Sequence, residues 1–170
     1  MNLKPWFVKL STLVLTIILS LTIFSLPASA FDKDALLRLE DRNECSGCDL
    51  SGAPLNCSKL SEANLSNANL RNASLNNADL TNANLEGAEL NDATLIYANL
   101  SGSDTNLKKA ILVGADLSMA DISEANMQGA NLKNATLRET NLCNTFLFEA
   151  TMPDDTIYDP GITVLERNCP

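Results

Sequence analysis

Five cysteines are the residues of this chain best suited to chemistry: Cys45, Cys48, Cys57, Cys143 and Cys169. Cys45 and Cys48 form a CxxC pair, a spacing that can bind metal, exchange thiols or close a disulfide. A single CxxC without histidine or a second cysteine pair is not a zinc site, and no βαβ pattern surrounds it. The sequence therefore favours structural disulfides and predicts no metal. Because the count is odd, at least one thiol is left over or pairs externally.

Carboxylates could support acid–base chemistry, but the chain contains no histidine to work beside them. A His-based triad or a His-ligated metal is therefore impossible. Acid–base catalysis also needs acids gathered in a pocket, where their pKa values can shift. The repeat described below instead spreads Asp79, Glu86, Glu89 and Asp92 along a solvated outer surface. We expect no catalytic residue, no enzyme activity, no cofactor and no small-molecule substrate.

The elements that carry these residues follow a five-residue repeat. From Leu50 to Leu100, and again from Leu107 to Met152, every fifth residue is a repeat centre, and 18 of the 21 centres are Leu. The residue two places earlier is Ala in 16 repeats. The step from Leu100 to Leu107 is seven residues, which indicates a two-residue insertion at 103–104. We expect it to bulge at a corner without ending the array.

A period of five excludes a helix and a long strand. Five residues rotate a helix by about 140°, which would scatter the leucines, and an odd period would alternate them between the faces of a strand. A short strand followed by a two-residue turn keeps Ala and Leu on one side, with Asn, Ser and Asp at the turns. Repetition of this unit predicts a coil with an apolar inside. The expected core residues include Leu65, Leu70, Leu85, Leu117 and Leu132.

Tandem units such as Ala63-Asn64-Leu65 resemble the pentapeptide-repeat family. The resemblance covers residues 48 to 153, and the stretch 45–53 is similar to the start of the array in cyanobacterial members. It implies an all-β solenoid: a right-handed, quadrilateral parallel β-helix with four pentapeptides per coil. About five coils would give a rod of about 25 Å at the usual strand spacing. With the export signal described next, the chain resembles exported cyanobacterial members of the thylakoid lumen or periplasm.

Residues 1–30 have the pattern of a secretory signal peptide. Lys4 and Lys9 precede an apolar run over 10–26, and Ala28-Ser29-Ala30 offers a cleavage site. The alternative is a retained membrane anchor, but the run is short for a span of about 20 residues. We expect cleavage after Ala30, no stable membrane insertion afterwards, and export to the lumen or periplasm.

The exported chain divides into an N-terminal helical cap over 31–47, a β-helix over 48–152, and a C-terminal cap or tail over 153–170. An amphipathic helix is expected over 32–44, with Asp32 or Asp34 as its N-cap. Its apolar residues could cover the first coil: Phe31, Ala35, Leu36 and Leu39. An apolar tail could cover the last coil, and it contains Ile157, Tyr158, Ile162, Val164 and Leu165. Such covers matter because open edges invite association.

The implied coil limits the disulfide pairings. Cys57 lies in the first coil and Cys143 near the last, about 19 Å apart by strand spacing, so they cannot bond within one rod. We expect one bond among Cys45, Cys48 and Cys57, and a second between Cys143 and Cys169. Because Cys48 occupies an inward Ala column, Cys45–Cys57 is slightly favoured at the first end.

Bulky apolar residues at outward positions are candidate contact sites. Ile96, Tyr97, Ile111 and Val113 lie near the seven-residue step in sequence. They form either a local packing cluster or a contact surface. Phe146 and Phe148 flank Leu147 on outward positions, where the C-terminal tail could cover them.

Charge narrows the choice of partners. Residues 31–170 hold 10 Lys and Arg and 21 Asp and Glu, a net charge of −11. Phosphate backbones and anionic membranes are therefore disfavoured. We expect a structural or protein-binding module, monomeric or an end-to-end dimer, that presents a rigid acidic face. The alternative is a DNA-mimicking inhibitor of a DNA-binding enzyme, as some members of the family are, but export argues against it. Ice binding would need columns of Thr, which are missing.

Overall fold

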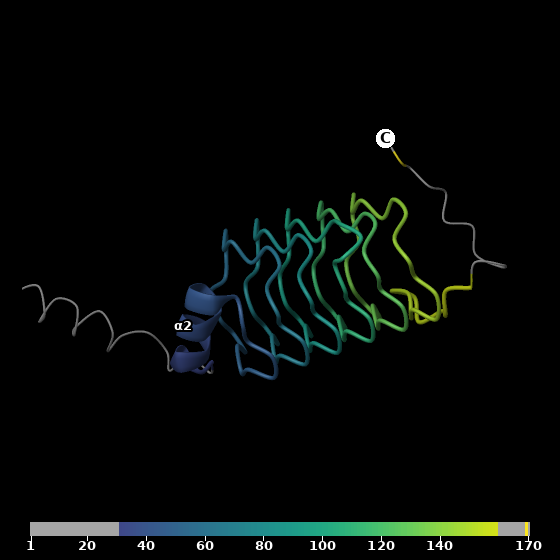
Figure 1. Cartoon of the computed structure of the whole chain (residues 1–170). Helices are drawn as coiled ribbons and strands as arrows, with labels where there is room; N and C mark the ends of the chain where they lie inside the picture. Colours follow the sequence, from purple (N-terminus) through teal and green to yellow (C-terminus); the bar gives the residue numbers. More distant parts are fainter. Residues whose placement is uncertain (1–30, 160–168, 170) are drawn as a thin grey trace, which may run out of the picture.

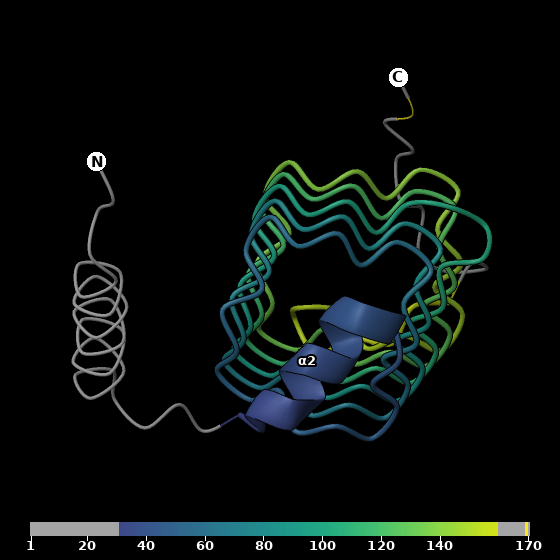
Figure 2. The ribbon, with the colours of Figure 1, turned by 60° about the vertical axis from the view of Figure 1, so that its left-hand side comes forward.

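The computed structural model describes residues 31–159 and Cys169 (Figure 1). Its one helix within these residues, α2 (Lys33–Arg42), precedes a stack of four-sided coils, seen end-on in Figure 2. The expected signal peptide and the tail residues Ile162, Val164 and Leu165 lie outside the described residues. Within the described part of the chain, no helix has the length and apolar character needed to cross a membrane.

Single-residue parallel bridges, not longer strands, connect successive coils in four columns, which we call sides A to D. Side A holds Glu44, Asn64, Asn84, Asn106, Asn126 and Phe146; side B holds Asp49, Asn69, Glu89, Ile111, Asn131 and Thr151. Side C holds Pro54, Ser74, Thr94, Asp116 and Thr136; side D holds Lys59, Asp79, Asn99, Asp121 and Asn141. Each column advances by 20 residues, or four pentapeptides, per coil, except for one step of 22 residues across the insertion.

The backbone bonds explain why the bridge is so short. The N–H of Leu65 donates to the carbonyl of Asn84 in the next coil at 2.7 Å, and the N–H of Asn84 donates back to Ala63 at 2.9 Å. The turn then bends the chain through a bond from Ala68 N–H to Leu65 C=O at 3.1 Å. The inward-facing segment of the repeat thus pairs its backbone groups with the neighbouring coils, as buried backbone requires.

The core is the pair of Leu and Ala columns. Because Ala and Leu are two residues apart in an extended segment, both point inward. The five leucines expected in the core are all 0 % exposed: Leu65, Leu70, Leu85, Leu117 and Leu132. Three Thr replace Ala, and each hydroxyl bonds a backbone carbonyl: Thr105 bonds Ser101, Thr140 bonds Leu117, and Thr145 bonds Ile122, all at 2.8 Å.

The second residue of each corner adopts a left-handed backbone. Asn67, Asn72, Asn77 and Asn82 have φ between 55° and 57°. Asn and Gly tolerate this conformation better than other residues, which explains why they recur at this corner position.

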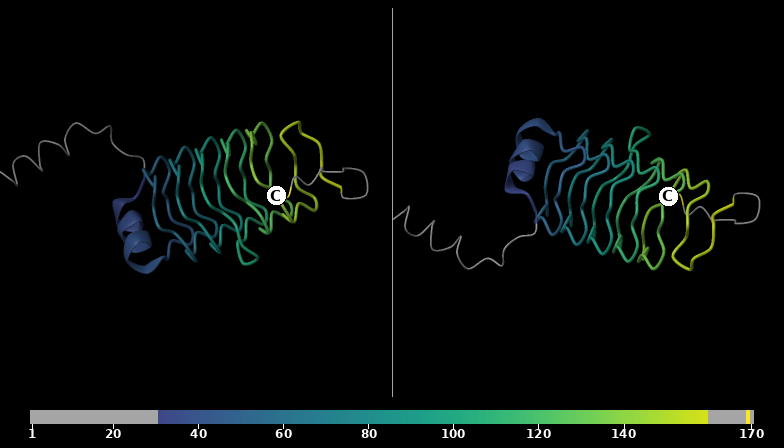
Figure 3. Two further views of the ribbon diagram at one scale, coloured as in Figure 1. Left: turned by 90° about the horizontal axis from the view of Figure 1, so that it is seen from above. Right: turned by 90° about the horizontal axis from the view of Figure 1, so that it is seen from below.

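The insertion at 103–104 forms an exposed bulge and the stack continues past it, as the sequence predicted. The bridge spacing changes from 20 to 22 residues, as in Asn84–Asn106, and later returns to 20. The loop protrudes from the stack in both views of Figure 3. Buried Thr105 holds its base, because its hydroxyl accepts from Asn82 N–H and donates to Ser101 C=O, both at 2.8 Å.

Helix α2 lies across the N-terminal end of the stack (Figure 2). Asp32 is its N-cap and accepts from Asp34 N–H at 2.9 Å. Ala35 and Leu39 are 0 % exposed within the core cluster, and Phe31 and Leu36 pack against it half-buried. The Asp32 N–H also donates to Asp49 C=O at 2.9 Å, which joins the start of the helix to side B.

The C-terminal end is covered on one side by the described residues. Ile157 forms an antiparallel bridge with Thr151, and Tyr158 N–H donates to Ala150 C=O at 2.7 Å, both on side B. On the other three sides, no described residue accepts from the backbone N–H of Leu137, Leu142 or Leu147. Leu137 and Leu142 are only half-buried, unlike the leucines of earlier coils.

Candidate interaction surface

Most outward polar side chains bond within their own coil or to the next one. Asp79 accepts from the backbone N–H of Thr81 at 3.1 Å and from its hydroxyl at 2.5 Å. Asn99 and Ser101 repeat the arrangement one coil later. These Asx turns fix the side chains on a rigid backbone. The surface is therefore preorganised, which lowers the entropy cost of binding a partner.

Side D and the corner that follows it carry more acidic than basic side chains. Side D contributes Asp79 and Asp121, and the DA corner contributes exposed Glu62, Asp104 and Glu124. The three ion pairs among the described residues all lie elsewhere: Arg42–Asp41, Arg71–Glu89 and Lys133–Asp155. A cation on side D is Lys59, at its N-terminal end. We call this region the acidic face, and no ion pair among the described residues involves it.

The structure separates the four residues of the expected contact patch. Ile111 is on side B, and Val113 follows it at the corner between sides B and C. Ile96 and Tyr97 form the next corner, between sides C and D. The two pairs are thus divided by side C and do not make one patch around the insertion, which lies at the DA corner. Tyr97 is exposed, while the other three are half-buried.

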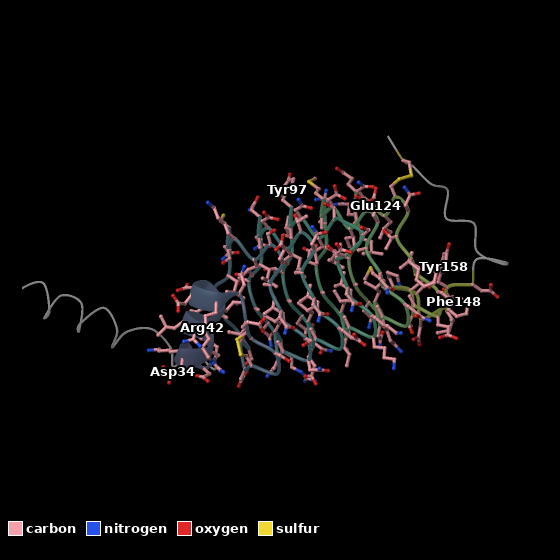
Figure 4. The ribbon with its side chains drawn as sticks, in the orientation of Figure 1. Asp34, Arg42, Tyr97, Glu124, Phe148 and Tyr158 are labelled. Atoms are coloured by element: carbon pink, nitrogen blue, oxygen red, sulfur yellow. A yellow bond between two sulfur atoms is a disulfide. The ribbon has the colours of Figure 1, made fainter. Side chains whose placement is uncertain are left out.

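Met119, which was not part of the expected patch, lies next to Tyr97 in the following coil. Tyr97 N–H donates to Ser118 C=O at 3.1 Å, so Met119 is the residue stacked next to Tyr97 at the CD corner. Both have left-handed backbones, with φ of 59° and 58°. The sequence signal for Met119 was the repeat position itself, where Asn or Gly is usual. In the view of Figure 4, Tyr97 and Glu124 both lie near the upper margin of the rod, at the two corners on either side of side D.

The favoured pairing of Cys45 with Cys57 is wrong. The structure joins Cys45 to Cys48, with a Cα–Cα distance of 5.2 Å, and leaves Cys57 free and exposed. Cys57 is a corner residue with φ of 58°, so it faces outward. Cys45 lies five residues before Leu50 and therefore continues the inward Leu column, where it is 2 % exposed. That register was the signal that could have identified the correct pair.

At the C-terminal end the structure joins Cys143 to Cys169, the pair that the sequence favoured, across a separation of 26 residues. Phe146 and Phe148 lie one coil side away and are stacked with ring centroids 6.4 Å apart. They are 53 % and 40 % exposed, and no described residue covers them fully.

The acids do not form a reaction centre within the described residues. No group of three or more Asp, Glu, Cys or His side chains there could hold a metal. A shallow hollow of about 380 Å³ lies on α2, lined by Leu37, Arg38, Asp41 and Arg42. Hydrogen bonds from the hydroxyl and then the N–H of Ser51 lower the pKa of Asp49 below its ordinary 3.8, and Thr156 lowers the pKa of Asp154 in the same way.

Comparison with known families supports the repeat. A family model described as pentapeptide repeats matches in eight copies, over residues 44–82, 73–104, 103–138 and 125–152. No curated protein sequence matches the chain.

Several solved structures are similar. A pentapeptide-repeat protein, Rfr23, from the cyanobacterium Cyanothece 51142 is 30% identical, with a TM-score of 0.56, over 74% of this chain and 98% of that chain. HetL from Nostoc, a pentapeptide-repeat protein involved in regulating heterocyst differentiation, is 25% identical, with a TM-score of 0.30, over 68% and 81%. A pentapeptide-repeat protein from the Arabidopsis thaliana thylakoid lumen is 29% identical, with a TM-score of 0.27, over 71% and 72%. Of these three, the Cyanothece protein alone has a TM-score above 0.5.

Proposed function

The chain belongs to the pentapeptide-repeat family, and from this premise we propose that it is an exported, non-enzymatic module that binds a protein partner through the acidic face of its β-helix. The finer parts of the proposal are a right-handed coil, as in the family, and export to the thylakoid lumen or periplasm. Cleavage after Ala30 would leave a helical cap over 31–47, a β-helix over 48–152 and a tail over 153–170.

The observation that carries the proposal is that the acidic face combines rigid side chains with negative charge. Turn bonds from Thr81 and Ser123 hold the carboxylates of Asp79 and Asp121, and neither carboxylate forms an ion pair among the described residues. Fixed, unpaired charges steer complementary partners and set the register of binding. A rod built from four coil sides also offers a wide surface, which suits a macromolecule better than a small ligand.

Crosslinking in the compartment where the protein resides would test this function. The tagged full chain, produced in its native host, should yield one or two specific protein partners by mass spectrometry. The matched control carries Glu62→Lys with Glu124→Lys. Both positions should accept Lys, because Lys109 already occupies the equivalent left-handed corner position in another repeat. That control should lose the partners and stay folded.

Three results would contradict the proposal. The same background from both variants would remove the protein-binding role. Self-crosslinks alone would favour a self-associating structural protein. Uncleaved protein in the cytoplasm, bound to a DNA-processing enzyme, would favour DNA mimicry.

A further inference from the structure

Tyr97 is an outlier in the repeat. It occupies the corner position where the coil before it has Asn77, and it holds a left-handed backbone with φ of 59°. A bulky residue in this conformation is unusual and costs on the order of 1 kcal/mol relative to Asn or Gly. Its side chain is also 58 % exposed, so burial does not offset the cost. Folding alone gives no reason for a tyrosine here.

Tyr97 is part of a continuous apolar ridge, which we define as Ile96, Tyr97 and Met119. Ile96 precedes Tyr97 at the CD corner and Met119 stacks on it in the next coil, with one bridge spacing of about 4.8 Å between them. Ile96 and Met119 are half-buried, which leaves Tyr97 as the exposed crest. An exposed apolar feature with a polar surround is typical of the centre of a binding site.

The charges beside the ridge specify the partner. The ridge borders side D, whose Asp79 and Asp121 take part in no ion pair among the described residues, and Glu124 lies beyond them. Resting on the proposed function, we propose that the ridge and the acidic face form one docking surface. Its occupant is a protein segment that places an apolar side chain on Tyr97 and Lys or Arg side chains over side D.

Other occupants fit less well. Nucleic acid is repelled by the same carboxylates. A second copy of this chain offers Lys108 and Lys109 at the AB corner, where Glu86 lies one coil before them and Phe148 two coils after them. Self-association is therefore treated as an outcome of the test.

A defined probe can test the surface before the natural partner is known. The probe is a fluorescent peptide of alternating Lys and Leu, with Lys–Ser and Glu–Leu peptides as comparisons, measured by anisotropy against the folded chain. We expect the Lys–Leu peptide to bind more tightly than the Lys–Ser and Glu–Leu peptides. Tyr97→Asn with Met119→Asn should weaken it about tenfold. Asp79→Asn with Asp121→Asn should weaken it about fivefold at low salt.

The variants are chosen to preserve the fold. Asn already occupies the left-handed position at Asn77, and Asn99 already makes the turn bonds that Asp79 makes. The matched control is Asp49→Asn with Asp92→Asn, which removes two charges from side B and its following corner. It should leave peptide affinity unchanged.

Several outcomes would overturn the inference. Equal weakening by the control pair would show general attraction to negative charge. Binding that survives loss of Tyr97 and Met119 would exclude the ridge, and a concentration-dependent dimer abolished by the ridge variant would identify a second copy as the occupant. If native crosslinking finds a partner at the DA corner of the acidic face, away from Tyr97, the proposed function stands and this surface fails.

Discussion

Each end of the stack would expose apolar core residues and unpaired backbone groups if it were left open. The described residues cover the two ends differently. At the N-terminal end α2 lies over the core, and the first coil carries Pro54 on side C and Lys59 on side D (Figures 1 and 2). Proline lacks an N–H and lysine carries a charge, and both discourage a further strand from pairing. At the C-terminal end the corresponding positions are Thr136 and Asn141, which do neither.

The core side chains are also more deeply buried at the N-terminal end than at the C-terminal end. Leu39 and Ala35 close the first end at 0 % exposure, whereas Leu137 and Leu142 remain half-buried at the last coil. A hairpin over 152–158 pairs with side B alone, and Phe146 and Phe148 stay exposed beside it. Among the described residues, the N-terminal end is therefore the more fully covered of the two.

The largest expected effect comes from truncating one leucine at each end. Leu39→Ala should lower the free energy of unfolding by about 2–4 kcal/mol, because it opens a cavity under α2. Leu142→Ala should cost about half as much, because its side chain already contacts solvent. Chemical denaturation followed by circular dichroism would measure both. Equal losses of unfolding free energy would show that the two leucines are packed equally well, contrary to the difference in their burial.

The two disulfides should differ in their resistance to reduction. Cys45 and Cys48 are 2 % and 5 % exposed under α2, whereas Cys169 is exposed and Cys143 half-buried. Under native conditions a dithiol should reduce Cys143–Cys169 about tenfold faster, since the first pair requires local opening. Alkylation and peptide mass mapping at timed intervals would show the order. Simultaneous reduction would mean that α2 opens readily.

Self-association should depend on the C-terminal end. Phe146→Asn with Phe148→Ser restores residue types found at these positions in earlier coils, such as Asn126 and Ser66. We expect sedimentation velocity to show end-to-end dimers of the wild-type chain at high concentration and a dissociation constant about tenfold weaker for the variant. The control is Leu37→Ser on the exposed face of α2, which should change nothing. Dimers lost only in the control would place the contact at the other end.

The smallest effect is a pH dependence shared by both ends. Because the folded pKa of Asp49 and of Asp154 is lowered, each contributes stability above the unfolded value of 3.8 and loses it as pH falls through the folded pKa. Asp49→Asn should therefore flatten the stability curve slightly below pH 3.8. Denaturation midpoints between pH 2 and 5 would measure this; an unchanged slope would exclude Asp49 as a contributor.

Much of the architecture followed from the sequence because the repeat is local. The spacing of Ala63 and Leu65, and of every equivalent pair, fixes which side chains face inward whatever the neighbouring coil contains. The same local logic located the corners, the helix capped by Asp32 and the bulge at 103–104. The proposed protein-binding surface has no such local signature, since the outward positions differ from repeat to repeat.

The tertiary structure decided which outward residues meet. Tyr97 and Met119 are 22 residues apart and adjacent, because one coil plus the insertion brings them together, whereas Ile96 and Val113 are closer in sequence and lie at different corners. The cysteine pairing was decided in the same way. Cys57 is near Cys45 in sequence, but the corner turns it outward while Cys45 faces the core with Cys48. A local period determines the face of each residue, and the number of residues per coil determines its neighbours.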